Sequence, residues 1–273
     1  MAVKIIDVDR IFEKQVRSAM MSNKGKFTED EWEDKIAGMY SQFGKTPLAE
    51  FDGKSPEAYY GSFSGEELAS ALKKHVTSGV DVSTYLFDAL VSSGGAEDYL
   101  IAFLDDKNEE LVSYAVNILA EKKSDKALKI FLERIACDET NENIRESMGE
   151  AVIDNAKELQ NLLLAVKGKA GKGEMYVAEA LARCDRKQEI FEYLTGEFMK
   201  ESDNNMIAYY ACLLSEYGDD RAVEFLKTKI NEPELDYAAY SELKNCIEEL
   251  GGECDDLRDF SGDATYKRIK NLS

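Results

Sequence analysis

Tyrosines recur along this sequence at a spacing that could build a binding surface. Five of them stand at intervals near 30 residues, or once near twice that: Tyr85, Tyr114, Tyr176, Tyr210 and Tyr240. Acidic residues accompany them, and the three grouped with this surface are Glu110, Glu174 and Glu179. A carboxylate neutralises a Lys or Arg side chain, and a tyrosine ring adds a cation–π contact of about 0.5–2 kcal/mol. The pattern predicts that these residues bind a basic segment of a protein or peptide partner.

The same tyrosines also fit a purely structural role. A tyrosine can place its ring in the core between helices while its hydroxyl reaches the surface. The series is interrupted in one predicted repeat, where Arg145 and Glu146 stand at the position of a tyrosine. Binding surface and core are therefore two open interpretations of one pattern.

Histidine chemistry is restricted by composition, because His75 is the single histidine. It stands toward the end of a predicted helix, where a side chain that can carry positive charge suits the helix dipole. A His-based zinc site would lack a second histidine, and with His75 in that role none is left for a Ser-His-Asp triad. We expect no catalytic residue, no metal site and no cofactor.

A glycine-rich segment, Gly-Lys-Ala-Gly-Lys-Gly at 168–173, has some features of a phosphate-binding loop. That loop requires Ser or Thr after its final Gly-Lys, and a buried strand before it. Here Gly173 is followed by Glu174, whose charge would repel phosphate. The segment is predicted to be a flexible turn between two helices.

The five cysteines are odd in number and mostly far apart, which argues against a disulfide framework and favours a reducing cytoplasm. Three of them, Cys184, Cys212 and Cys246, are separated by 28 and 34 residues and fall in or near the second helices of predicted repeats. We expect small buried core residues at these positions.

The formal net charge is -20, and it is unevenly distributed. Residues 1–62 carry 9 Lys and Arg against 11 Asp and Glu, whereas residues 63–273 carry 25 against 43. Such a surface repels nucleic acid and anionic membranes and attracts basic partners. Solubility alone would also explain an acidic surface. We therefore expect no nucleic-acid and no membrane partner.

Helices are predicted nearly throughout, because the chain has only 3 prolines and many strong helix formers. Its longest apolar run, Met206–Leu214, is far shorter than the roughly 18 residues that suggest a membrane span. In the N-terminal part, Thr28 with Glu31 and Ser64 with Glu67 are typical of capping boxes. Two further helix starts are predicted at Thr46-Pro47 and Ser55-Pro56.

From about residue 64, helices recur in pairs. The first helices of the pairs begin near Glu66, Glu97, Asp125, Lys157, Lys187 and Asp219, and the second helices near Asp81, Glu109, Asn141, Gly173, Asn204 and Asp236. An interval near 32 residues with two helices per unit is the signature of a helical solenoid. One hairpin cannot bury its own apolar face, so neighbouring units would have to stack.

Residues 64–250 resemble the HEAT-like repeat family, including its short bilin-lyase-type variant. The resemblance is carried by Tyr99–Leu119 with Asp125–Leu132, and again by Ala211–Tyr217 with Gly218–Leu226. Arg145 matches an arginine often found early in the second helix, and the preceding repeat has Ser113 there. The resemblance implies an all-α fold, a right-handed α-α superhelix of about six helix pairs with an irregular helical N-terminal cap.

Three segments are expected: a helical cap at 1–62, the repeats at 63–250, and a polar cap with a basic tail at 251–273. The tail could lie in a groove or be free. The leading functional hypothesis is a non-catalytic protein-binding module. The alternatives are an enzyme similar to bilin lyases or, less compatible with the charge, DNA glycosylases, and an acidic protein that neutralises a basic toxin. The oligomeric state is left open.

Overall fold

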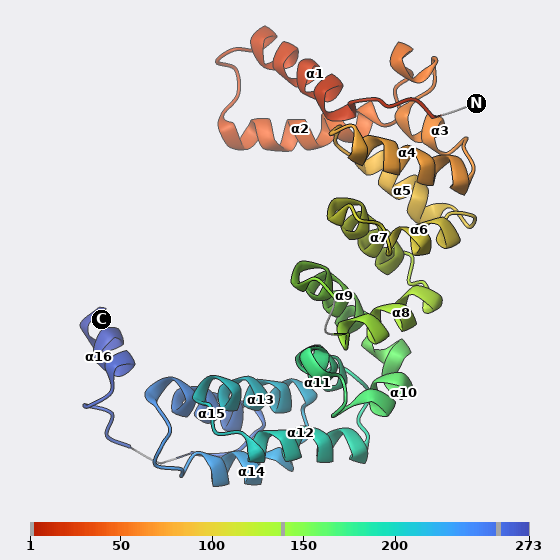
Figure 1. Ribbon diagram of the computed structural model, residues 1–273. Helices are drawn as coiled ribbons and strands as arrows, with labels where there is room; N and C mark the ends of the chain where they lie inside the picture. Colours follow the sequence, from red (N-terminus) through yellow and green to blue (C-terminus); the bar gives the residue numbers. More distant parts are fainter. Residues whose placement is uncertain (1–2, 138–139, 255–257, 273) are drawn as a thin grey trace. The chain divides into compact units, whose positions relative to one another are not determined.

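The computed structural model describes residues 3–137, 140–254 and 258–272, and every regular element in these ranges is helical (Figure 1). The predicted all-α class is confirmed, since no strand occurs in the described ranges. The chain divides into two compact units, Met1–Leu128 and Lys129–Ser273, and the division falls inside helix α8, Asp125–Ile135. In the described part, no helix is both long and apolar enough to cross a membrane.

The first unit contains the N-terminal helices and two complete helix pairs. Its elements are α1 Val8–Ser22, α2 Glu29–Phe43, the 3-10 turn η1 Ala49–Phe51, α3 Pro56–Tyr60, α4 Gly65–Thr77, α5 Thr84–Ser92, α6 Glu97–Phe103 and α7 Glu109–Glu121. Helix α4 packs against α5, α6 and α7, and α5 also packs against α7. Each pair thus covers apolar residues of the next, as a single helical hairpin requires.

The second unit continues with helices in the same alternation. Its elements are α9 Glu142–Asp154, α10 Ala156–Val166, η2 Gly171–Gly173, α11 Glu174–Ala182, α12 Gln188–Lys200, α13 Asn204–Tyr217, α14 Ala222–Lys229, α15 Tyr237–Glu249 and α16 Ala264–Leu272. Figure 1 shows them following one another in chain order. Each second helix packs on the next one, in the order α9, α11, α13 and α15. The basic C-terminal segment is part of α16, which packs on α15 through the Tyr266 and Tyr237 rings, 5.0 Å apart.

The twelve helix starts predicted from about residue 64 onward are confirmed to within three residues. The largest differences, three residues each, occur at Asp81 and Asp219, which make other contacts and do not begin a helix. Ser83 caps α5 by accepting from the Leu86 amide, and the carbonyl oxygen of Asp81 lies 3.1 Å from Nδ1 of His75. Asp219 precedes α14 and accepts from the Arg221 guanidinium at 2.6 Å.

Both predicted capping boxes are present, at Thr28 with Glu31 and at Ser64 with Glu67. Ser55 caps α3 with Pro56 at its first position. The start predicted at Thr46 is wrong, because no helix begins there. Its hydroxyl instead donates backwards to the carbonyl oxygen of Gln42 at 2.8 Å and so closes the end of α2.

Aromatic side chains join the N-terminal helices to the first helix pair. Phe12 of α1 lies edge-on to the Tyr40 and Phe43 rings of α2, at 4.9 and 5.4 Å. The Tyr40 ring in turn stacks on Tyr85 of α5 at 5.3 Å. These contacts cover the exposed end of the first helix pair, which supplies a structural purpose for the first 62 residues.

Cationic side chains reach from one helix pair to the carbonyl groups at a helix end about 30 residues earlier. Lys122 donates to the Val91 and Ser93 carbonyl oxygens at 2.6 and 2.7 Å. Lys229, only 3% exposed, donates to the Glu201 carbonyl oxygen at 2.6 Å. Arg258 does the same for Ile230 and Glu232, both at 2.7 Å. The last carbonyl groups of a helix have no intrahelical donor, so these bonds satisfy groups that would otherwise be unpaired.

Arg145 performs this task over a shorter distance in the sequence and is 1% exposed. From α9 it donates to the carbonyl oxygens of Ile135, Cys137 and Thr140, at 3.2, 2.9 and 3.0 Å. It also pairs with Glu142 at 2.5 Å. The arginine expected from the repeat pattern therefore closes the end of α8 and the connection to α9.

We predict that Arg145→Met lowers the free energy of unfolding by about 2–4 kcal/mol, because three carbonyl groups lose a charged donor. Urea unfolding followed by far-ultraviolet circular dichroism measures the loss. Arg183→Met is the matched control. Arg183 is exposed and makes only surface ion pairs, so its loss should cost less than about 1 kcal/mol. Equal effects of the two variants would contradict the proposed role of Arg145.

Candidate functional site

Three of the five predicted tyrosines lie in the core. Tyr85 is 8% exposed, and Tyr210 and Tyr240 are each 6% exposed. The Tyr85 hydroxyl donates to the carbonyl oxygen of Tyr40 at 2.9 Å. The Tyr240 ring packs against Phe260 at 4.9 Å and lies 5.4 Å from the Arg258 guanidinium of the same chain. At these positions the core interpretation accounts for the pattern.

Two of the three predicted acids are already engaged. The Glu174 carboxylate accepts from the Gly168 and Ala170 amides at 2.6 and 2.8 Å and from the Tyr193 hydroxyl. It thus occupies the amide groups that a phosphate-binding loop would offer to phosphate, and the predicted turn is confirmed. Glu179 pairs with Arg183 at 3.0 Å.

Tyr114 and Glu110 belong to a surface of the first unit that we call the Tyr114 surface, formed with Asp9 and Asp81. Glu110 and Asp81 are exposed, and Tyr114 and Asp9 are half-buried. Burial, followed by the charges of Glu110 and Asp81, raises the pKa of Tyr114. Burial and then the charge of Asp81 raise the pKa of the Asp9 carboxyl. These three carboxylates make no ion pair within the described part of the chain.

Tyr176 lies across α9 in the second unit. A Cβ atom placed on Gly149 of α9 would lie 2.3 Å from the Tyr176 ring, so the ring packs directly on the glycine backbone. Burial raises the pKa of Tyr176 first, and the charges of Glu142 and Glu146 raise it further. Tyr176 thus packs on the backbone of α9 and lies beside the acids of that helix.

The acids beside Tyr176 form a row along α9 with a spacing of four residues, which we call the α9 acidic row: Glu142, Glu146, Glu150 and Asp154. All four are exposed. Residues four apart are neighbours on a helix, and each like-charged pair at this spacing destabilises the helix by about 0.2–0.5 kcal/mol. Glu142 pairs with Arg145, but Glu146 and Glu150 make no ion pair among the described residues.

Arg183, the C-cap residue of α11, forms ion pairs with acids of three helices. It contacts Asp154 of α9 at 3.7 Å, Glu179 of α11 at 3.0 Å and Glu216 of α13 at 3.0 Å. This network neutralises the end of the α9 acidic row and leaves its middle uncompensated.

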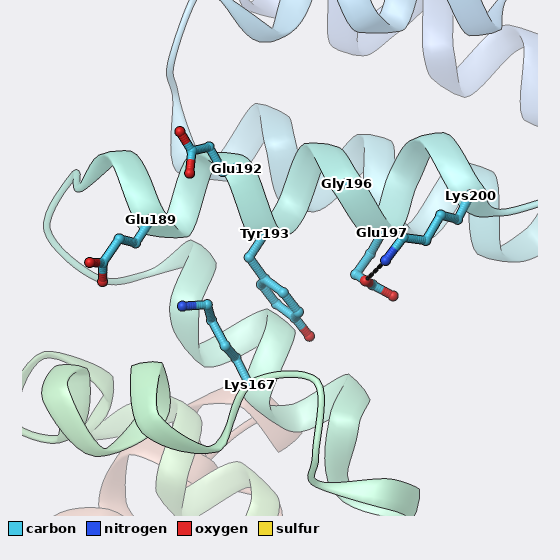
Figure 2. A pocket seen from close by; sticks show the side chains of 7 residues that line it. All are labelled: Lys167, Glu189, Glu192, Tyr193, Gly196, Glu197 and Lys200. Carbon is cyan, nitrogen blue, oxygen red and sulfur yellow. Dashed lines mark hydrogen bonds and ion pairs between the residues drawn. The ribbon is translucent and has the colours of Figure 1, made fainter.

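A shallow depression of about 400 Å³ lies elsewhere in the second unit, along α12. Figure 2 shows the Tyr193 ring pointing from α12 toward the segment that carries Lys167. Seven residues line the depression: Lys167, Glu189, Glu192, Tyr193, Gly196, Glu197 and Lys200. Lys200 pairs with Glu197 at 2.7 Å, so part of the acidic charge is neutralised locally.

The histidine and three of the cysteines considered in the sequence differ in their burial. His75 is fully buried, and its Nε2 atom has no hydrogen-bond partner in the described part of the chain. Cys184 and Cys246 are buried as expected. The expectation for Cys212 is wrong, because it is exposed. It shares the outer side of α13 with Glu216, whereas Leu213 and Leu214 face inward.

Comparisons with protein-family models and with curated proteins gave no match. The likeness to HEAT-like repeats therefore rests on the quoted sequence windows and stays a prediction. The α9 acidic row is not among the predicted binding residues. It nevertheless has a signal in the sequence, because acids stand at every fourth position of a predicted helix. Asp9 has no such signal, because its approach to Asp81 depends on how the N-terminal helix folds back.

We predict that Gly149→Ala destabilises the chain by about 1–3 kcal/mol, because the new methyl group overlaps the Tyr176 ring. Combining it with Tyr176→Ala should remove most of this overlap penalty. The control is Gly196→Ala in α12, where nothing lies within 4 Å and the helix preference of alanine should add about 0.5–1 kcal/mol. Thermal unfolding by circular dichroism gives both values. A stabilised Gly149→Ala variant would show that the ring does not rest there.

We predict that Asp81→Asn lowers the pKa of Asp9 toward its ordinary value, by removing the like charge that raises it most after burial. A raised folded-state pKa means that stability is greatest below the unfolded pKa and falls as pH rises through the folded one. The variant should weaken this fall, which nuclear magnetic resonance titration and unfolding between about pH 3 and 6 can follow. Asp34→Asn, an exposed acid of α2, is the control. An unchanged Asp9 pKa would contradict the proximity of the two carboxylates.

Proposed function

We propose that this chain is a non-catalytic, HEAT-like helical repeat protein that binds a basic segment of a partner protein on acidic, tyrosine-containing faces of its second helices. Within this proposal, about six helix pairs form a right-handed superhelix and the chain acts in the cytoplasm. The principal contact is the α9 acidic row with Tyr176, and the Tyr114 surface offers the same chemistry in the first unit.

The single observation that carries the proposal is the uncompensated middle of the α9 acidic row. Glu146 and Glu150 stand one turn apart, exposed, with no ion pair among the described residues. Repulsion between them costs helix stability. A bound cation on each carboxylate would remove that cost, so the row is better suited to a complex than to the isolated chain.

The spacing of the row suggests the form of the ligand. Four residues of helix rise by about 6 Å, and alternate side chains of an extended strand are about 6.7 Å apart. An extended segment with Lys or Arg at every second position can therefore place successive cations near successive carboxylates. Tyr176, beside the row, can add a cation–π contact.

The test uses two peptides of equal composition, one with lysines alternating with serines and one with all lysines grouped at one end. We predict that the alternating peptide binds the full chain more tightly, and that Glu146→Gln with Glu150→Gln weakens it about tenfold, because two ion pairs are lost. Isothermal titration calorimetry at low and physiological salt measures both affinities. Binding should weaken as salt rises.

The matched control is Glu189→Gln with Glu192→Gln on α12, which removes the same charge from the depression in Figure 2. This variant should bind the alternating peptide almost as well as the original chain. Equal losses in the two double variants would mean that only the overall negative field attracts the peptide. That result, or equal affinity for the two peptides, would contradict the proposed site.

A further inference from the structure

Two cysteines and a glutamate converge on the outer side of the second unit. They are Cys212 of α13 and Glu242 and Cys246 of α15, and their ligand atoms all lie within 4.8 Å of one another. The Cys212 Sγ atom is 3.1 Å from a Glu242 carboxylate oxygen. Cys212 is exposed, Glu242 is half-buried and Cys246 is buried.

Regular packing brings the three residues together. Glu242 and Cys246 are four residues apart, which places them on one side of α15. Cys212 stands one repeat earlier on α13, and α13 packs closely against α15. The convergence therefore depends on two well-packed helices, and supporting helices hold ligands more precisely than loops do.

The donor set restricts the metal. Thiolates are soft ligands that select zinc or copper(I) over magnesium or calcium, and a carboxylate oxygen favours the divalent ion over copper(I). Tetrahedral zinc with Zn–S bonds of about 2.3 Å needs its ligand atoms about 3.8 Å apart, which the observed separation limit accommodates.

We propose that Cys212, Glu242 and Cys246 form a three-ligand site for Zn²⁺, with water in the fourth position. The exposed side of Cys212 gives the ion a path of entry, and the buried side of Cys246 excludes water behind it. On binding, each thiol releases one proton to solvent and its sulfur coordinates the ion. The metal joins α13 to α15, and the open position faces solvent.

This assignment extends beyond the proposed binding of a basic segment and is independent of it. The α9 acidic row shares no residue with the site. The site also differs from zinc sites that are recognised in a sequence. Its two cysteines are 34 residues apart on different helices, whereas such sites use a short motif.

The test uses the full chain, kept reduced with a phosphine, and Co²⁺ as a coloured probe for Zn²⁺. One Co²⁺ per chain should produce a thiolate-to-metal charge-transfer band and the absorption of a tetrahedral site. Added Zn²⁺ should abolish both signals. Cys212→Ser should remove the band or weaken Co²⁺ binding by at least about tenfold, and Glu242→Gln should weaken binding while retaining sulfur coordination.

Two controls match these changes. Cys137→Ser removes another exposed thiol from the same unit, and Glu249→Gln removes one charge from the same helix. Both should bind Co²⁺ as the original chain does, with unchanged circular dichroism. Absence of a sulfur band in the original chain, or an equal band in the Cys212→Ser variant, would overturn the assignment. So would equal weakening by Glu249→Gln and Glu242→Gln, since only charge would then matter.

Discussion

The last carbonyl groups of an α-helix have no donors within the helix, and this chain must end many short helices beside packed neighbours. Lys122, Lys229 and Arg258 meet this constraint by reaching back about 30 residues to earlier helix ends, and Arg145 meets it over 10 residues or fewer. The long side chains bury their stems while the charged groups replace water as donors. Apolar stacking alone would leave these carbonyl groups unpaired.

This arrangement separates the cations that maintain the fold from the acids at the surface. In the second unit, Arg145 is turned inward, whereas the exposed Arg183 pairs with three acids. The α9 acidic row consequently keeps uncompensated charge beside a tyrosine that Gly149 allows to pack against the helix backbone. Net charge alone would not identify such a place, because acids elsewhere, such as Glu197, have local cationic partners.

Sequence reasoning predicted the helices well because their signals are local. Capping boxes at Thr28 and Ser64 depend on residues three apart, and the repeat interval places the helix starts. It could not decide which tyrosines face the core, since burial depends on the rotation of each helix against its neighbours. Tyr85 and Tyr176 each stand near the start of a helix, yet the first is buried under Tyr40 and the second is half-exposed. The exposure of Cys212 escaped prediction for the same reason.

The two proposed sites in the second unit use different physical means. The α9 acidic row repeats hard oxygen donors about every 6 Å along one helix, an arrangement suited to several cationic side chains in a row. Cys212, Glu242 and Cys246 gather softer donors within 4.8 Å across two helices, a separation suited to one thiophilic ion. In both proposals, the helices set the ligand. Repetition of acids along one helix selects a basic segment of a partner, and convergence of side chains from two helices selects a metal ion.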